Sequence, residues 1–266
     1  MGSKISSEQP INTDNIIQKR TWIQKLFCIR DNRKFILGII DPQNDFFEKG
    51  KLPIPNANKI IGPINKLRFI CYQNKTRTFI SQNSYLPTHI SFASTHNKEP
   101  FTKIMVDLVI KNQENIIEEQ FLWPTHCVKN STGADFHPDL FVFHTDKIIQ
   151  KGTNINVNSY SAFGDKFNNL YENTGLAKWL QVKKPTDIIL VGISTQSCIG
   201  NTALEAIKKG YSVHIILSCV YISELNQQTT NEAIIDMKSL GVIFYDDIEN
   251  FVLENKTKFS YTNIFI

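Results

Sequence analysis

The segment from residue 187 to residue 210 places a cysteine at a strand-to-helix turn, and it constrains the fold more than any other part of the sequence. Its first half, DIILVG, is a short apolar run with β-branched residues, which is typical of a buried parallel strand. Its second half has apolar residues at helical spacing, at Ala203, Leu204 and Ile207, and ends on a glycine after two lysines. Cys198 therefore lies at or beside a helix N-terminus, where the dipole and unpaired N–H groups favour the thiolate.

Strands and helices alternate along the rest of the chain. Strands are predicted at 35–40, 78–81, 147–150, 188–193, 213–218 and 242–245, and helices near 58–72, 175–181 and 230–239 as well as after Cys198. This alternation predicts an α/β fold, a three-layer sandwich with a six-stranded, mostly parallel sheet and helices on both faces. Residues 83–143 carry few regular signals and are longer than an ordinary loop, which indicates a functional segment or a lid.

Composition narrows the classes of function and location. A chain of 266 residues with 41% hydrophobic and 20% charged residues is long enough for one large domain. The net charge of +4 is too small and too dispersed to indicate nucleic-acid binding. Five scattered cysteines without a Cys-x-x-Cys pair, and the lack of a secretory signal, predict a reducing, cytoplasmic location. No apolar run approaches the roughly 18–20 residues of a membrane span.

Residues 1–34 are predicted to be a partly disordered N-terminal extension, ahead of a domain at 35–266. The start, MGSKIS, fits the N-myristoylation pattern, which requires Gly2 and a hydroxyl residue at position six. Residues 15–30 mix apolar and basic side chains, as in an amphipathic helix that could supply the second membrane signal a single acyl chain needs. The alternative is that the match to the myristoylation pattern arose by chance and that the helix docks on the domain. Peripheral membrane contact is therefore an expectation.

Three reactive side chains follow three of the predicted strands. Asp41 comes directly after the first strand, Lys151 ends the third, and Cys198 follows the fourth. In a parallel sheet the carboxyl ends of the strands meet at one edge, where binding sites form. Taken singly, each residue has an ordinary structural explanation. The aspartate could be a turn residue, the lysine a solvent-exposed side chain and the cysteine a small buried side chain. Together they offer an acid–base, a cation and a nucleophile.

These three groups suit acyl transfer through a covalent intermediate. The Asp41 carboxylate can take the thiol proton and later pass it to a leaving group. The Lys151 ammonium favours the charged forms of its two neighbours. The Cys198 thiolate can attack a carbonyl and form an acyl-enzyme, while backbone N–H groups, expected at Ser194 and Cys198, bind the oxyanion.

Five motifs resemble the nicotinamidase branch of the isochorismatase-like cysteine hydrolases. They are DPQNDF at 41–46, HISFAS at 89–94, LWPTHCV at 122–128 with the following GA and HP pairs, KG at 151–152 with SYSAF at 159–163, and VGISTQSC at 191–198. They stand in order, with fitting spacing, between residues 35 and 245. The resemblance implies that Asp41, Lys151 and Cys198 form a triad that hydrolyses nicotinamide to nicotinate and ammonia. It also implies a cis peptide between Ile193 and Ser194.

The same resemblance implies a binding pocket and a metal. Gln43, Phe46, Trp123 and Tyr160 would contact the substrate, the aromatic residues forming a slot for a flat pyridine ring. A divalent metal, zinc or iron, would hold the ring nitrogen.

The metal positions of this family fall on Asn83, Tyr85, His89 and His126. An amide oxygen is a poor zinc ligand, and a phenol resists deprotonation. Two of the expected ligands are thus replaced, and the alternatives are a site rebuilt with another residue such as His96, a weaker ion, or no metal.

Three functions therefore stay open. The first is nicotinamide hydrolysis through a Cys198 thioester. The second is a metal-free hydrolase of another small amide or ester, which the change at Asn83 and Tyr85 favours. The third is a non-catalytic binding protein that uses its N-terminal segment for attachment. In the first two the partner is a small molecule, and the family resemblance makes a homo-oligomer an expectation.

Overall fold

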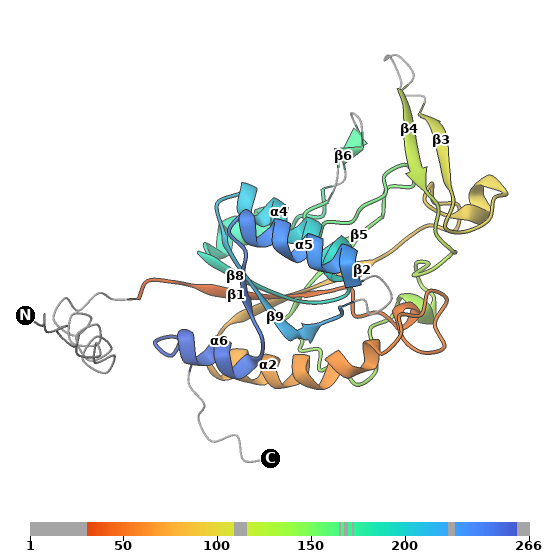
Figure 1. Ribbon diagram of the computed structural model, residues 1–266. Helices are drawn as coiled ribbons and strands as arrows, with labels where there is room; N and C mark the ends of the chain where they lie inside the picture. Colours follow the sequence, from red (N-terminus) through yellow and green to blue (C-terminus); the bar gives the residue numbers. More distant parts are fainter. Residues whose placement is uncertain are drawn as a thin grey trace, which may run out of the picture. The chain divides into compact units, whose positions relative to one another are not determined.

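A single parallel sheet organises the computed structural model, which describes residues 31–108, 116–164, 166–167, 170–171, 173–222 and 227–259. The strand order is β10-β9-β8-β1-β2-β5, and every neighbouring pair is parallel (Figure 1). The strands are β1 (Phe35–Ile40), β2 (Arg77–Asn83), β5 (Lys147–Lys151), β8 (Asp187–Gly192), β9 (Ser212–Val220) and β10 (Ile243–Tyr245). The six-stranded sheet predicted from the sequence is confirmed.

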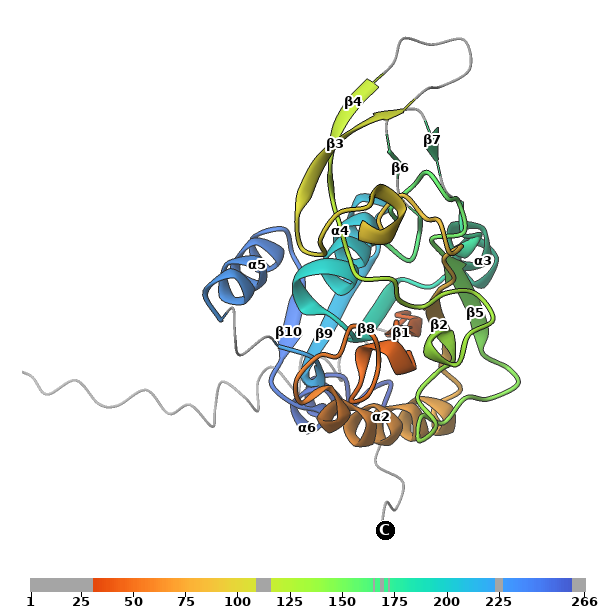
Figure 2. The ribbon, with the colours of Figure 1, turned by 90° about the vertical axis from the view of Figure 1, so that its right-hand side faces the viewer.

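Helices cover both faces of this sheet, as predicted. Figures 1 and 2 show α3 (Leu176–Lys183), α4 (Gly200–Lys208) and α5 (Gln227–Ser239) on one face, and α2 (Ile61–Gln73) and α6 (Ile248–Glu254) on the other. Short 3₁₀ turns occur at Asn44–Phe46, Ala57–Ile60, Ala93–His96 and Thr132–Ala134, and a π-helical turn at Thr195–Ile199. The three-layer sandwich is therefore the architecture of the domain.

The central strands are recognisable in the sequence because both of their faces are covered. All six residues of β1 and all six of β8 are buried. Strands buried on both faces lose the polar alternation of a half-exposed strand and become continuous apolar runs. Their register pairs Ile40 with Gly192, so the two strands end side by side. Their carboxyl ends place the residues that follow them at one edge of the sheet.

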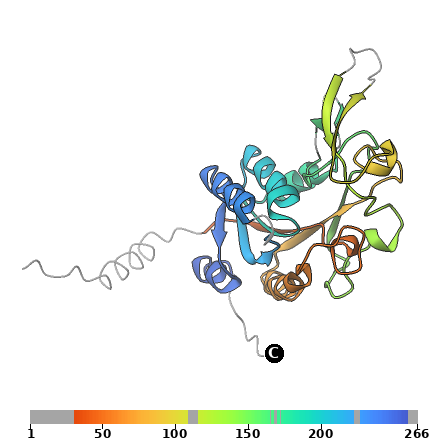
Figure 3. The same cartoon turned by 45° about the vertical axis from the view of Figure 1, so that its right-hand side comes forward.

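A β-hairpin inside the long segment 83–143 was not predicted. Strands β3 (Lys103–Leu108) and β4 (Ile116–Phe121) pair antiparallel and extend away from the sheet (Figure 3). Among the side chains that the structure describes here, a small cluster of Ile90, Ile104 and Val106 packs against the hairpin, while Met105 and Ile117 are exposed. Because the hairpin buries so little, its sequence lacks the alternation that marks a half-buried strand. The two-residue strands β6 (Lys166–Phe167) and β7 (Leu170–Tyr171) and helix α6 were also not predicted.

The remainder of the long segment is tied to the carboxyl edge of the sheet. Isolated bridges join Gln43 to Phe136, Tyr85 to Val128, and Phe92 to Trp123. The main chain of residues 85–92 is therefore held against residues 123–128, and residue 136 against residue 43. This pairing fixes one wall of the site described below.

Several expectations fall outside the described residues. Gly2, the amphipathic segment 15–30 and Cys28 all lie there, so acylation and membrane contact stay predictions. Within the described ranges, no helix is long and apolar enough to cross a membrane. The four described cysteines are free thiols: Cys71, Cys127, Cys198 and Cys219.

Candidate active site

The structure brings together the three predicted reactive side chains. Asp41 directly follows β1, Lys151 is the last residue of β5, and Cys198 lies in the π-helical turn between β8 and α4. Lys151 Nζ lies 3.0 Å from Asp41 Oδ2 and 3.5 Å from Cys198 Sγ. A cation thus bridges a carboxylate and a thiol, which is the arrangement expected from the three strand ends.

Lys151 is a fully buried cation with several acceptors. Besides Asp41, its ammonium donates to Asn83 Oδ1 at 2.7 Å and to the Ser159 carbonyl at 3.1 Å. Burial by itself lowers the pKa of Lys151, but the nearby Asp41 and Cys198 outweigh it and hold that pKa well above its usual value. Lys151 therefore stays positively charged at neutral pH.

The Asp41 carboxylate is held from two sides. Ser81 Oγ donates to Asp41 Oδ1 at 2.6 Å, while Oδ2 faces Lys151. The Asp41 N–H in turn donates to Ser81 Oγ at 3.0 Å, and the residue has φ of 50°, in the left-handed region. Ser81 lies on the neighbouring strand β2. The carboxylate is therefore oriented by adjacent strands before any substrate arrives.

The surroundings of Cys198 favour the neutral thiol in the free protein, in contrast to the thiolate expected from the sequence. Burial raises the pKa of Cys198 to about 12, with Asp41 adding to the rise and Lys151 opposing it. The residue lies two positions before the start of α4, inside the π-helical turn Thr195–Ile199. The enclosed position and the Asp41 charge outweigh the helix end, so the thiol must lose its proton during the reaction.

A tight turn presents the cysteine. The Ile193–Ser194 peptide is cis, as the resemblance implied. Gly192 has φ of 116°, and a Cβ there would lie 2.2 Å from the Ile40 carbonyl oxygen, so only glycine fits. Thr195 Oγ1 donates to the Tyr221 carbonyl, and this bond fixes the first residue of the π-helical turn. Ser194 and Cys198 both line the cavity, and the oxyanion role of their N–H groups stays a prediction.

A cavity of about 370 Å³ opens over the triad. The predicted aromatic residues Phe46, Trp123 and Tyr160 line it together with Asp41 and Cys198. Trp123 Nε1 donates to the Tyr160 hydroxyl at 3.2 Å, which fixes the two rings relative to each other. Further lining residues that the sequence did not single out are Leu52, Pro53, Ile54, Pro55, Phe101, Gln196, Ser197 and Tyr221. The cavity is large enough for one small aromatic ring and is mostly apolar.

Gln43 does not line this cavity, which corrects its predicted contact with substrate. Its amide nitrogen donates to the carbonyls of Asn83 and Ala134, at 2.8 and 2.9 Å. Its Oε1 accepts from the Asn83 N–H at 2.7 Å. Gln43 is therefore a positioning residue behind the wall. In a sequence, a glutamine that bonds backbone looks the same as one that binds substrate.

Two of the four metal positions have no lone pair available. Asn83 Oδ1 accepts from Lys151 Nζ at 2.7 Å and from the Tyr85 hydroxyl at 3.1 Å. The His89 ring is fully buried, with Nε2 3.1 Å from the carbonyls of Asn154 and Val157. A carbonyl only accepts, so Nε2 carries the proton, and Nδ1 faces Ser91 Oγ at 2.8 Å.

The remaining two positions do not complete a site. Burial raises the pKa of Tyr85 well above its usual value, so the phenol keeps its proton. His126 Nδ1 lies 2.7 Å from the Pro124 carbonyl, which leaves Nε2 as the one ring nitrogen of His126 that could bind a metal. His96 bonds the Ile90 carbonyl and lines a separate hollow beside the hairpin. No group of three metal-binding side chains occurs in the described part of the chain. The residues present do not fit a tightly held divalent metal.

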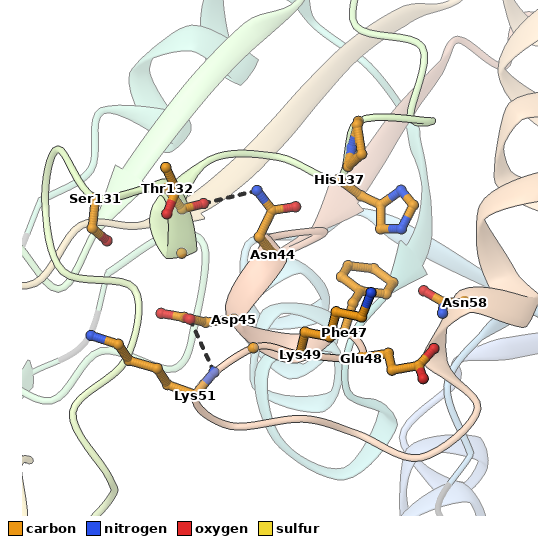
Figure 4. A pocket seen from close by; sticks show the side chains of 13 residues that line it. Asn44, Asp45, Phe47, Glu48, Lys49, Lys51, Asn58, Ser131, Thr132 and His137 are labelled. Carbon is orange, nitrogen blue, oxygen red and sulfur yellow. Dashed lines mark hydrogen bonds between the residues drawn. The ribbon is translucent and has the colours of Figure 1, made fainter.

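Asp45, the second acid of the first motif, has a structural role that sequence reasoning missed. Its carboxylate accepts from the Cys127 N–H at 2.6 Å. It also accepts from the Lys51 N–H at 3.0 Å (Figure 4). A Cβ on Gly133 would lie 2.2 Å from that carboxylate. The hollow of about 460 Å³ beside it is polar and holds none of the triad. Asp45 therefore joins the first motif to the LWPTHCV motif and fixes His126.

Comparison with known proteins decides the family. The model of the isochorismatase domain family matches residues 35–247. The chain belongs to the isochorismatase family. Nicotinamidase from Escherichia coli (strain K12) is 32% identical over 79% of this chain and 93% of that protein. Nicotinamidase from Saccharomyces cerevisiae is 31% identical over 68% of this chain and 85% of that protein.

Solved structures of this isochorismatase fold agree with the architecture. The yeast nicotinamidase bound to the inhibitor nicotinaldehyde superposes with a TM-score of 0.73, at 26% identity, over 80% of this chain and all of that chain (100%). Pyrazinamidase of Pyrococcus horikoshii in complex with zinc gives a TM-score of 0.64, at 26% identity, over 80% of this chain and 98% of that chain. A zinc ion is thus present in one structural relative.

Proposed function

We propose that this isochorismatase-family protein is a nicotinamidase, an amidohydrolase that converts nicotinamide and water to nicotinate and ammonia. The observation that carries the proposal is the contact of Lys151 with both Asp41 and Cys198 at the floor of an aromatic cavity. Relatives named nicotinamidase, 31–34% identical over most of the chain, support the same substrate. The non-catalytic alternative has no comparable support, because a dead enzyme has no physical reason to keep this charged, buried set.

The reaction begins with proton transfer from the thiol. Because the pKa of Cys198 is about 12, the thiol is neutral when substrate binds. The Asp41 carboxylate accepts the proton as Sγ attacks the amide carbon. Lys151 remains protonated beside both groups and stabilises the negative charge that develops on them. The carbonyl oxygen becomes an oxyanion facing the turn that presents Cys198.

Collapse of this intermediate breaks the carbon–nitrogen bond. The proton on Asp41 passes to the leaving nitrogen, which departs as ammonia and leaves a thioester on Cys198. Asp41, again a carboxylate, then takes a proton from a water molecule that attacks the thioester. The same proton returns to Sγ as nicotinic acid leaves, and in solution this acid gives up its proton to ammonia, leaving nicotinate and ammonium. Atoms balance, and the triad is restored without an external acid or base.

The cavity walls position the ring of the substrate. Phe46, Trp123 and Tyr160 surround the space above Cys198 and offer flat apolar faces. Holding the ring there brings the amide carbon to the sulfur and excludes water from the attack. A divalent metal, as seen in the Pyrococcus relative, is not needed for any of these steps.

Ammonia release from nicotinamide tests the proposal. Purified protein is expected to release ammonia and nicotinate in equal amounts, and Cys198→Ala is expected to release neither. Cys71→Ala is a matched control, because Cys71 is a buried thiol on α2, away from the cavity. Equal activity in wild type and Cys198→Ala, or no activity in any variant that folds, would overturn the proposed function.

A further inference from the structure

We propose that this chain recognises the ring nitrogen of its substrate without a metal, by a hydrogen bond from the Tyr85 hydroxyl. The inference rests on the proposed function for the identity of the ring. Tyr85 and Asn83 form the polar wall of the cavity beside the triad, and both are almost fully buried. A pyridine nitrogen has one lone pair and no hydrogen, so it needs a donor there.

The Tyr85 hydroxyl is free to turn to a ligand at little cost. In the free protein it donates to Asn83 Oδ1 at 3.1 Å. The same oxygen also accepts from Lys151 Nζ at 2.7 Å. When the hydroxyl turns to the ring nitrogen, Asn83 keeps its charged donor and is not left unpaired. Redirecting the hydroxyl therefore costs less than the new bond gains, because Asn83 Oδ1 keeps Lys151 as a donor, whereas a buried ring nitrogen without a donor would have no hydrogen bond at all.

Asn83 is held in place for this exchange. Its N–H donates to Gln43 Oε1 at 2.7 Å, and its side-chain nitrogen lies 3.1 Å from the same oxygen. The amide therefore points Oδ1 at both Lys151 and Tyr85. A short chain of hydrogen bonds runs from the ring-binding hydroxyl to the catalytic ammonium, so ring binding and the triad share one polar framework.

His126 is another polar residue at this wall. Its neutral ring cannot replace the Tyr85 hydroxyl as the donor. Its Nδ1 lies 2.7 Å from the Pro124 carbonyl, which only accepts, so Nδ1 carries the proton. Its Nε2 then presents a lone pair, which repels the lone pair of a pyridine nitrogen. The Tyr85 ring packs edge-on against His126, with centroids 5.3 Å apart, so of these two neighbouring residues the phenol is the one that offers a donor hydrogen.

The inference predicts that nicotinamide is preferred over benzamide and that this preference depends on the hydroxyl oxygen of Tyr85. Benzamide has a C–H where nicotinamide has the ring nitrogen, so it loses the Tyr85 bond while the hydroxyl stays on Asn83. Because one neutral hydrogen bond contributes about 1 kcal/mol, nicotinamide is favoured over benzamide by about fivefold to tenfold in kcat/KM. Tyr85→Phe is expected to remove that preference by lowering kcat/KM for nicotinamide more than for benzamide.

The experiment compares the two amides after chelation and dialysis, with metal content measured on the same samples. Wild type is expected to contain far less than one zinc or iron per chain and to keep its activity. Tyr72→Phe is the matched control, because Tyr72 is exposed on α2. Binding of both amides to Cys198→Ala, with and without Tyr85→Phe, provides a readout without turnover.

The outcomes separate this inference from the proposed function. Stoichiometric metal with activity lost on chelation would overturn the inference and keep the function. An equal loss for both amides in Tyr85→Phe would mean a structural role and would also overturn it. Tyr85-dependent binding of nicotinamide without ammonia release would overturn the function and keep the inference.

A gain of metal binding provides a second check. Replacing Asn83→Asp and Tyr85→His together would add a carboxylate and an imidazole beside His126, giving three donors suited to zinc. The double variant is expected to retain about one zinc per chain after dialysis against a zinc-containing buffer, while wild type does not. Equal retention by both proteins would contradict the inference.

Discussion

At the scale of single residues, the site depends on a proton that moves rather than on a preformed thiolate. Burial and the Asp41 carboxylate raise the pKa of Cys198 to about 12, and Lys151 limits the rise. The raised pKa means that the folded protein holds the thiol proton tightly. The thiolate fraction in the free protein therefore grows as pH rises toward about 12 and is small at neutral pH.

Alkylation of Cys198 by iodoacetamide checks this protonation state. The rate, followed on the Cys198 peptide by mass spectrometry, is expected to rise steadily from pH 7 to pH 10. Asp41→Asn removes the charge that raises the pKa of Cys198, so alkylation at pH 8 is expected to speed up. The same variant loses the general base, and kcat is expected to fall about 10²- to 10⁴-fold. A rate that is already flat between pH 6 and pH 8 would show a preformed thiolate.

Residues differ in how far their roles could be predicted from the sequence. Asp41, Lys151 and Cys198 could be grouped because each follows a recognisable strand, and parallel strands end at one edge. Gln43 was misassigned, since its backbone bonds to Asn83 and Ala134 depend on tertiary contacts.

At the scale of elements, the turn after β8 requires a glycine. Gly192→Ala would place a Cβ 2.2 Å from the Ile40 carbonyl oxygen and would keep φ at 116°. Gly241→Ala is the matched control, because Gly241 also has positive φ, at 95°, but has open space at the Cβ position. The control isolates the backbone cost of about 1 kcal/mol. Gly192→Ala is expected to cost clearly more and to reduce activity, in urea unfolding and ammonia assays. Equal costs would refute the steric argument.

Helix α2 is fixed to the segment before β5 by a buried ion pair. Arg68 Nη2 lies 2.7 Å from Asp146 Oδ2, with both side chains at most 3% exposed, and the guanidinium stacks over Phe143 at 4.6 Å. Among the described residues, Arg68 Nε and Nη1 have no hydrogen-bond partner, so the carboxylate is the main compensation for the buried charge.

Removing that carboxylate is expected to destabilise the fold without altering the chemistry. Asp146→Asn should lower the free energy of unfolding by about 3–5 kcal/mol, because it leaves an uncompensated buried cation. Glu249→Gln at the exposed Lys66–Glu249 pair should cost at most about 1 kcal/mol. Urea denaturation measures both, and kcat per folded molecule should be unchanged. A loss for Asp146→Asn no larger than the control would be inconsistent with a compensating role.

Helices and strands could be predicted where their packing requires a recognisable pattern of apolar residues in the sequence. The buried strands β1 and β8 were found almost to the residue because nearly all of their residues are apolar. The hairpin β3–β4 was missed because it rests on a small cluster rather than on the central core.

At the scale of the whole molecule, one sheet edge collects residues that lie far apart in the chain. The first and third motifs meet through Asp45 and Cys127, and the triad joins β1, β5 and the turn after β8. The order of strands along the sheet could not be inferred from the sequence pattern, because alternation fixes parallelism but not which strands are neighbours. Cytoplasmic location, N-myristoylation at Gly2 and a homo-oligomer stay predictions.

The most direct measurement is rapid-quench mass spectrometry of the protein mixed with nicotinamide. If Cys198 is the nucleophile, a nicotinoyl thioester should accumulate on the Cys198 peptide before steady state and decay as nicotinate appears. The adduct should be absent in Cys198→Ala and should not occur on Cys127, the thiol of the LWPTHCV motif. Ammonia release without any adduct at Cys198, or an adduct on a different thiol, would contradict the covalent mechanism.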